Sequence, residues 1–117
     1  MKHILKNYLR IMSIELDDLR EDIKFLIGEC KLKRDEDKIT NYVYLENIAL
    51  YNNELHALDA FEKIIARTEA GEFGTLEELI DFLKKEFVEK ARTSGYARVI
   101  HLLVDRKIQK VAKYICQ

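Results

Sequence analysis

Two histidines carry the residue spacing that comes nearest to enzyme chemistry in this chain of 117 residues. His56 is followed three positions later by Asp59, and His101 is followed four positions later by Asp105. On a helix, these spacings place each imidazole and its carboxylate on one face. If the two segments were neighbours, the four side chains could form a metal site or an acid–base pair.

The surroundings of both histidines favour a structural role. His56 stands among polar residues that predict a solvated surface, and His101 borders an apolar helical face. The Glu-x-x-His signature of di-iron bundles is missing, because Asn53 and Arg98 stand three positions before the histidines. Phosphotransfer is also disfavoured, since an acidic residue follows each histidine within about one turn and would repel phosphate. We therefore expect no catalytic residue, metal or cofactor, and keep a site at the two histidines as the third hypothesis.

The strongest pattern is a stripe of apolar residues along the first thirty positions. Its members recur at alternating spacings of four and three, which is the heptad period of packed helices. The chain lacks proline, so no residue forces a helix to break. The stripe predicts a helix over residues 2–32 and a candidate interface that consists of Leu5, Leu9, Met12, Leu16, Leu19, Ile23 and Leu26.

A second line of apolar residues follows a neighbouring face of the same helix. It consists of Ile4, Ile11, Phe25 and Leu32, and Asp18 interrupts it. A two-stranded coiled coil would leave these side chains in water, so we expect this helix to contact two neighbours, as a bundle helix does. Glu15 and Arg20 also have the offset of an interhelical pair in a parallel dimer.

A charged segment and a glycine predict the limits of the second helix. Residues 31–38 are almost entirely charged and predict the first turn, with Asp35 or Asp37 as the N-cap of the next helix. Gly71 is expected in the C′ position that ends this helix near residue 70. Its apolar face includes a line of residues spaced seven positions apart, which consists of Val43, Leu50, Ala57 and Ile64.

Two shorter helices are predicted after this glycine. Thr75 and Glu78 form a capping box that opens the third helix, and Ser94-Gly95 closes it. Apolar periodicity then predicts a fourth helix over residues 96–115. The fold class we expect is all-α, with one domain over residues 1–117. This domain is a mostly antiparallel four-helix bundle of two long N-terminal helices followed by two shorter ones.

Charge is distributed unevenly along a chain whose net charge is only −1. Residues 35–89 carry 5 basic and 14 acidic side chains, whereas residues 90–117 carry 7 and 1. The C-terminal segment predicts a basic surface formed by Arg98, Arg106, Lys107, Lys110 and Lys113. Nucleic-acid binding by residues 96–116 is the alternative hypothesis, but this helix lacks the interleaved aromatic or asparagine side chains of base recognition. We expect these cations to balance the acidic second and third helices.

Neither cysteine indicates a disulfide framework or a metal site. Cys30 continues the heptad stripe and is expected to be buried, while Cys116 lies next to the C-terminus. Lys6 and Arg10 interrupt the apolar core that a signal peptide needs, and no apolar run approaches the length of a membrane span. We therefore expect a cytoplasmic protein that does not interact with membranes.

The unequal helix lengths lead to an expectation about function. Two long helices cannot be covered completely by two shorter ones, and the apolar remainder needs a partner. A second copy is the commonest partner of that kind. We expect a non-enzymatic protein–protein interaction or regulatory module that acts as a homodimer, with a further protein partner also allowed.

Overall fold

The computed structural model describes residues 2–96 and 98–115, except for the side chains of Lys2 and Arg98; Cys116 lies outside the described residues. It contains α1 (Lys2–Asp35), α2 (Asn41–Arg67), a short 3-10 turn η1 (Ala70–Glu72), α3 (Leu76–Ser94) and α4 (Arg98–Ile115). The described residues include no strand. The predicted all-α fold, with two long helices followed by two shorter ones, is confirmed.

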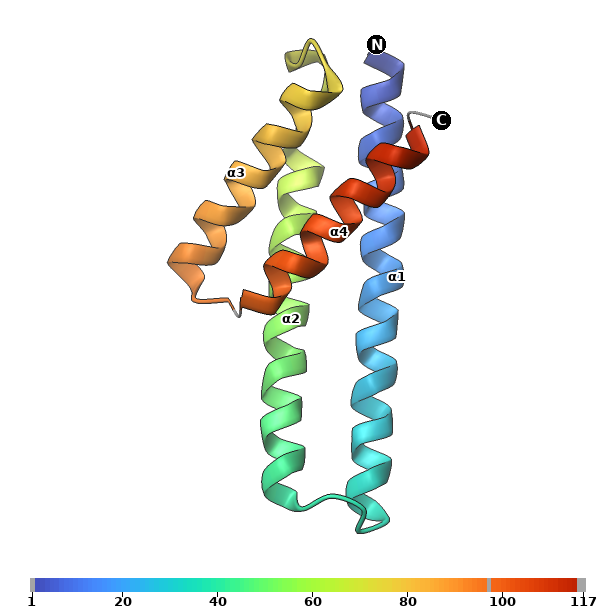
Figure 1. The fold of residues 1–117 in the computed structure, drawn as a ribbon, viewed down its shortest axis with the longest axis vertical. Coiled ribbons are helices and arrows are strands. Elements are labelled where there is room, and N and C mark those ends of the chain that lie inside the picture. The colour runs from blue at the N-terminus through green and yellow to red at the C-terminus, as the bar shows by residue number, and fades with distance from the viewer. Residues whose placement is uncertain (1, 97, 116–117) are drawn as a thin grey trace.

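The helices are arranged around a long hairpin formed by α1 and α2. Consecutive helices run in opposite directions, and α4 crosses in front of α1 and α2 (Figure 1). Both α3 and α4 lie beside only the upper half of the hairpin, so its closed end projects as two helices alone (Figure 1). We call this projecting part, residues 22–54, the arm. It gives the molecule an elongated shape of 54 × 30 × 19 Å.

The hydrophobic core lies in the upper half, where all four helices meet. Its fully buried large side chains are Leu5, Tyr8, Met12, Leu16, Leu58, Phe61, Leu79, Leu83, Ile100, Val104, Ile108 and Val111. The rings of Phe61 and Phe87 pack with their centroids 5.2 Å apart and join α2 to α3. Burial of this apolar surface is the main stabilising contribution to the fold.

The turn between α1 and α2 differs from the prediction. Asp37 adopts a left-handed conformation with φ of 58°, and the N–H of Lys38 donates to a carbonyl oxygen five residues earlier at 2.8 Å. These two features end α1. Thr40 caps α2, because its Oγ1 accepts from the N–H of Val43 at 3.1 Å. The prediction that Asp35 or Asp37 caps the second helix is therefore wrong.

The end of α2 also lies earlier than expected. The helix ends at Arg67, and Oγ1 of Thr68 donates to the carbonyl oxygen of Ile64 at 2.6 Å. Gly71 lies in η1, four residues beyond the end of α2, so its predicted C′ role is wrong. The Thr68 hydroxyl thus donates to a free carbonyl oxygen at the end of α2. In a helix that ends at a left-handed glycine, backbone N–H groups donate to these carbonyl oxygens instead.

Both predicted limits of α3 are confirmed. Oγ1 of Thr75 accepts from the N–H of Glu78 at 3.2 Å, and the Glu78 carboxylate accepts from the N–H of Gly74 at 2.9 Å. The first bond is the one that the capping box predicts, while the second reaches one residue further back. Gly95 ends the helix with a φ of 68°, a left-handed conformation that glycine adopts without strain.

Phe61 and Phe25 form a matched pair for testing where the core lies. Phe61 is fully buried, whereas Phe25 is 66% exposed in the arm. Phe61→Ala leaves a cavity and should lower the free energy of unfolding by about 3–5 kcal/mol. Phe25→Ala should change it by less than about 0.5 kcal/mol. Urea unfolding followed by circular dichroism at low protein concentration measures both, and equal losses would contradict this core.

Candidate functional site

The two histidine–aspartate pairs do not form a common site. His56 is exposed in an open cleft between α2 and α3, while the ring of His101 lies 5.5 Å from that of Phe87. Asp59 forms an ion pair with Arg20 at 3.1 Å, not with His56. Across the described part of the chain, no group of three His, Cys, Asp or Glu residues is placed to hold a metal. The geometry therefore gives no support to the metal or acid–base hypothesis.

The cleft beside His56 is lined by charges of both signs from α2 and α3. Arg67 on α2 pairs with Glu86 on α3 at 2.8 Å, and Glu89 pairs with Arg92 one turn further along α3. Opposite charges that already neutralise one another give little net attraction for an ion or a charged substrate. We interpret this cleft as a polar seam between two helices.

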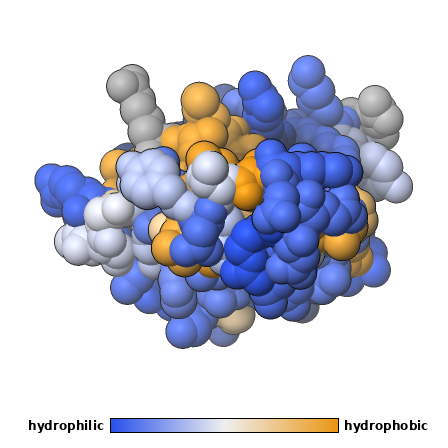
Figure 2. Space-filling model, turned by 90° about the horizontal axis from the view of Figure 1, so that it is seen from below, coloured by the Kyte–Doolittle hydropathy of each residue, from blue (hydrophilic) through white to orange (hydrophobic). Residues whose placement is uncertain are grey.

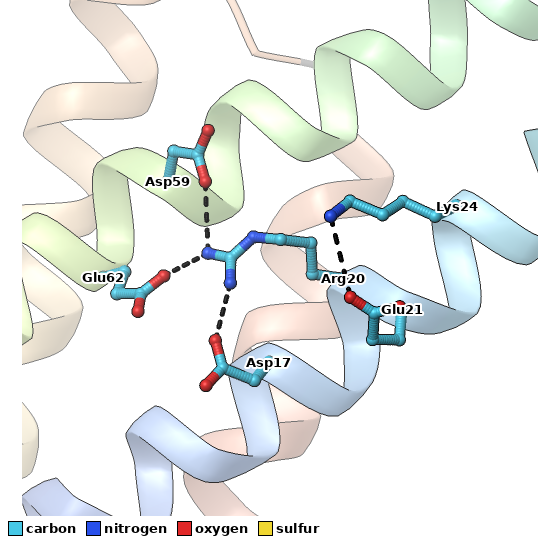
Figure 3. Close-up of polar contacts among 6 residues, drawn as sticks. All are labelled: Asp17, Arg20, Glu21, Lys24, Asp59 and Glu62. Carbon is cyan, nitrogen blue, oxygen red and sulfur yellow. Dashed lines mark hydrogen bonds and ion pairs between the residues drawn. The ribbon is translucent and has the colours of Figure 1, made fainter.

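Arg20 joins the two long helices where the arm begins. Figure 3 shows its guanidinium between Asp17 of α1 and the carboxylates of Asp59 and Glu62 on α2. The nitrogen–oxygen distances are 2.6 Å to Asp17 and 3.1 Å to Asp59. Burial opposes the charged guanidinium, yet the hydrogen bond to Glu62 and the nearby carboxylates raise the pKa of Arg20. This network fixes the register of α1 against α2.

Glu15 joins α1 to α4 through two ion pairs. Its carboxylate accepts from Nζ of Lys110 at 2.8 Å and from Nζ of Lys107 at 2.9 Å. These hydrogen bonds, first that of Lys110 and then that of Lys107, lower the pKa of Glu15, although its burial acts in the opposite direction. Seven residues earlier, the hydroxyl of Tyr8 donates to the carbonyl oxygen of Ile108 at 3.1 Å. One line along α1 therefore carries the polar contacts that hold α4.

Part of the predicted basic surface forms ion pairs within the chain. Lys107 and Lys110 bind the carboxylate on α1. Arg106 and Lys113 are exposed, and the side chain of Arg98 lies outside the described residues. The acidic partner that the structure describes for this surface belongs to α1, whereas the sequence led us to expect partners in the second and third helices.

The apolar stripe of α1 faces the interior of the same molecule. Leu5, Met12, Leu16 and Ile23 are buried, Leu9 and Leu19 are partly buried, and Leu26 is exposed. Glu15 and Arg20, which have the offset of a pair between two copies, pair within the chain. Six members of the candidate interface therefore pack in the core of the folded chain and are not available to a second copy.

Two heptad lines lose their cover below the turn that joins α3 to α4 (Figure 1). On α1 the line of Leu5, Met12 and Leu19 continues to Leu26, and on α2 the line of Ile64 and Ala57 continues to Leu50 and Val43. Their upper members are buried or partly buried, whereas Leu26, Leu50 and Val43 are 43%, 42% and 39% exposed. We call these three residues the open face of the arm. The sequence predicts both lines, but it does not indicate where their cover stops.

Glu54 lies beside the open face, and the sequence analysis missed it. It follows Leu50 by four residues, which places the two side chains on the same side of α2. The residue is buried, and this burial raises the pKa of its carboxyl. Its position among polar residues of α2 suggested only a solvated surface, so the sequence contained no signal of this burial.

Comparisons of the chain with protein-family models, curated protein sequences and solved structures find no match. Within the described residues, no helix combines the length and the apolar character needed to cross a membrane.

The pairing of Glu15 predicts a pH-dependent contribution to stability. Its pKa is lowered in the folded protein, so its ion pairs stabilise the fold at neutral pH, and this contribution is lost as the pH falls through the folded-state pKa. Glu15→Gln should lower the free energy of unfolding at pH 7 by up to about 1 kcal/mol. Urea unfolding should show a smaller difference from the wild-type protein in acid. A difference that stays constant with pH would contradict this role.

Proposed function

We propose that the chain is a non-enzymatic protein–protein interaction or regulatory module that acts as a homodimer. The observation that carries this proposal is the set of large apolar side chains exposed along the arm: Phe25, Leu26, Leu32, Val43, Leu45 and Leu50. Seen from the closed end of the arm, hydrophobic side chains are interspersed with hydrophilic ones (Figure 2). Grouped exposed apolar residues with polar surroundings are typical of interaction sites.

The outer face of α1 is the surface that we assign to the second copy. Phe25 is 66% exposed and Leu32 is 51% exposed, and their seven-residue spacing places both on one side of the helix. Ile4 belongs to the same line and is also exposed, but between it and Phe25 the line passes through Ile11, which packs against the core, and Asp18. In a two-fold dimer both copies contribute the same patch, so one apolar line on one helix can be covered by its symmetry mate.

Binding accounts for the charged residues better than catalysis does. Two partly buried charged groups, Arg20 and Glu15, are occupied in ion pairs that hold helices together. Two cations of the basic surface are occupied in the same way, which leaves fewer for nucleic-acid phosphates. We also propose a cytoplasmic location, which suits the free thiol of Cys30.

Sedimentation equilibrium at micromolar concentration tests the homodimer. The wild-type chain should give about twice the monomer mass, because the outer face of α1 pairs with its symmetry mate. A variant with Phe25→Glu and Leu32→Glu should be monomeric, since burying unpaired carboxylates at an interface is costly.

Val88→Glu with Leu102→Glu provides the matched control. These residues are similarly exposed but lie on α3 and α4, so the control variant should remain dimeric. Monomeric behaviour of the wild-type chain throughout this concentration range would overturn self-association. Loss of the dimer in both variants would overturn its assignment to the outer face of α1.

A further inference from the structure

The packing of α4 shows what kind of helix binds the side of α1 that carries Glu15. One side of α4 is apolar and buried, and consists of Ile100, Val104, Ile108 and Val111. Beside this apolar side, Lys107 and Lys110 reach the Glu15 carboxylate at 2.9 and 2.8 Å. The hairpin thus binds an amphipathic helix whose basic flank pairs with a carboxylate of α1.

The carboxylate line of α1 continues from Glu15 along the arm. Asp22 follows Glu15 by seven residues, and Glu29 follows Asp22 by seven, so the three share one line of the helix. Asp22 stands four residues before Leu26 and Glu29 three residues after it. Both are exposed, and the described residues offer neither of them a hydrogen bond or an ion pair. A carboxylate like the one that binds α4 at Glu15 therefore occurs twice more along this line, and the described residues provide no partner for either.

The second helix supplies one exposed carboxylate, Glu46, along the other edge of the open face, and the buried Glu54 lies near it. Glu46 stands between Val43 and Leu50, three residues after the first and four before the second, and Glu54 follows Leu50 by four. Within the described part of the chain, neither glutamate forms a hydrogen bond or an ion pair. Near the closed end of the arm, Lys33 adds one positive charge to α1. Because Glu54 is buried, the open face has an apolar centre with three exposed carboxylates on its edges: Asp22 and Glu29 on α1 and Glu46 on α2.

We propose that the open face of the arm binds a basic amphipathic helix of a partner protein, placed below the crossing of α4 over the hairpin. The apolar side of this helix covers Leu26, Val43 and Leu50. Lysine or arginine residues on its two flanks pair with the carboxylates of α1 and α2, as the lysines of α4 pair with Glu15.

The charge of the open face argues against a second copy as its occupant. Two such faces packed together would bring Asp22, Glu29 and Glu46 of one copy against the same residues of the other, and like charges repel. Asp22 and Glu29 also border the outer face of α1, so the additional repulsion at the open face comes from Glu46. This inference rests on the proposed role as an interaction module. It does not rest on self-association, which we assign to the outer face of α1.

A designed peptide tests this inference directly. The probe is a synthetic helix of about 14 residues, which matches the roughly 20 Å length of the arm, with leucine on one side and lysine on both flanks. One control peptide has the same composition in scrambled order, and another carries glutamate in place of every lysine. Fluorescence anisotropy at physiological salt should give a micromolar Kd for the probe and at least tenfold weaker binding for both controls.

Variants of the protein locate the binding site. Leu50→Glu should weaken binding of the probe at least tenfold, while Leu102→Glu on α4 should leave it unchanged. The double change Asp22→Lys with Glu29→Lys should also weaken it at least tenfold. Glu69→Lys with Glu72→Lys alters the net charge equally at exposed positions outside the arm, and should have little effect. Circular dichroism confirms that each variant is folded.

Three outcomes would overturn the inference. These are absence of binding, equal binding of the probe and its scrambled control, and equal loss of affinity in the two double-lysine variants, which would indicate attraction by net charge alone. The outcome is independent of the dimer. A dimer that does not bind the probe overturns only this inference, and a monomer that binds it overturns only self-association.

Discussion

The difference in length between the two pairs of helices determines what this molecule exposes. With 34 and 27 residues, α1 and α2 reach about 51 and 40 Å, whereas α3 and α4, with 19 and 18 residues, reach only about 29 and 27 Å. The shorter pair completes a four-helix core at one end of the hairpin. Two helices alone cannot enclose a core, so the apolar lines that continue into the arm end in solvent.

The arm keeps its shape through a narrow seam between α1 and α2. Cys30 and Tyr44 are buried there, the Arg34 guanidinium lies 4.0 Å from the centroid of the Tyr44 ring, and Nδ2 of Asn47 donates to Sγ of Cys30 at 3.8 Å. At the base of the arm, the Arg20 network sets the register of this seam. The seam occupies one side of each helix, which leaves the outer face of α1 and the open face free to bind different partners.

Local patterns were sufficient to predict the helices and most of the core. The cap at Thr75 and the left-handed Gly95 follow from residues close together in sequence. The charged first turn instead contains several residues that could cap α2, so the sequence did not single out Thr40. The candidate site was predictable only in part. Leu26 belongs to the heptad stripe whether or not it is covered, because cover depends on where α4 crosses the hairpin. The burial of Glu54 depends on that packing too, so no sequence pattern marks it.

The central claim is that the open face is a binding surface for a basic helix. Methyl resonances recorded while the lysine-flanked peptide is added test it most directly, because they report on each position separately. We expect the largest changes at the methyl groups of Leu26, Val43 and Leu50, with the buried methyl groups of Leu5 and Ile108 unchanged. Changes concentrated at Leu32 on the outer face of α1, or at the buried contacts of α4, would contradict the account.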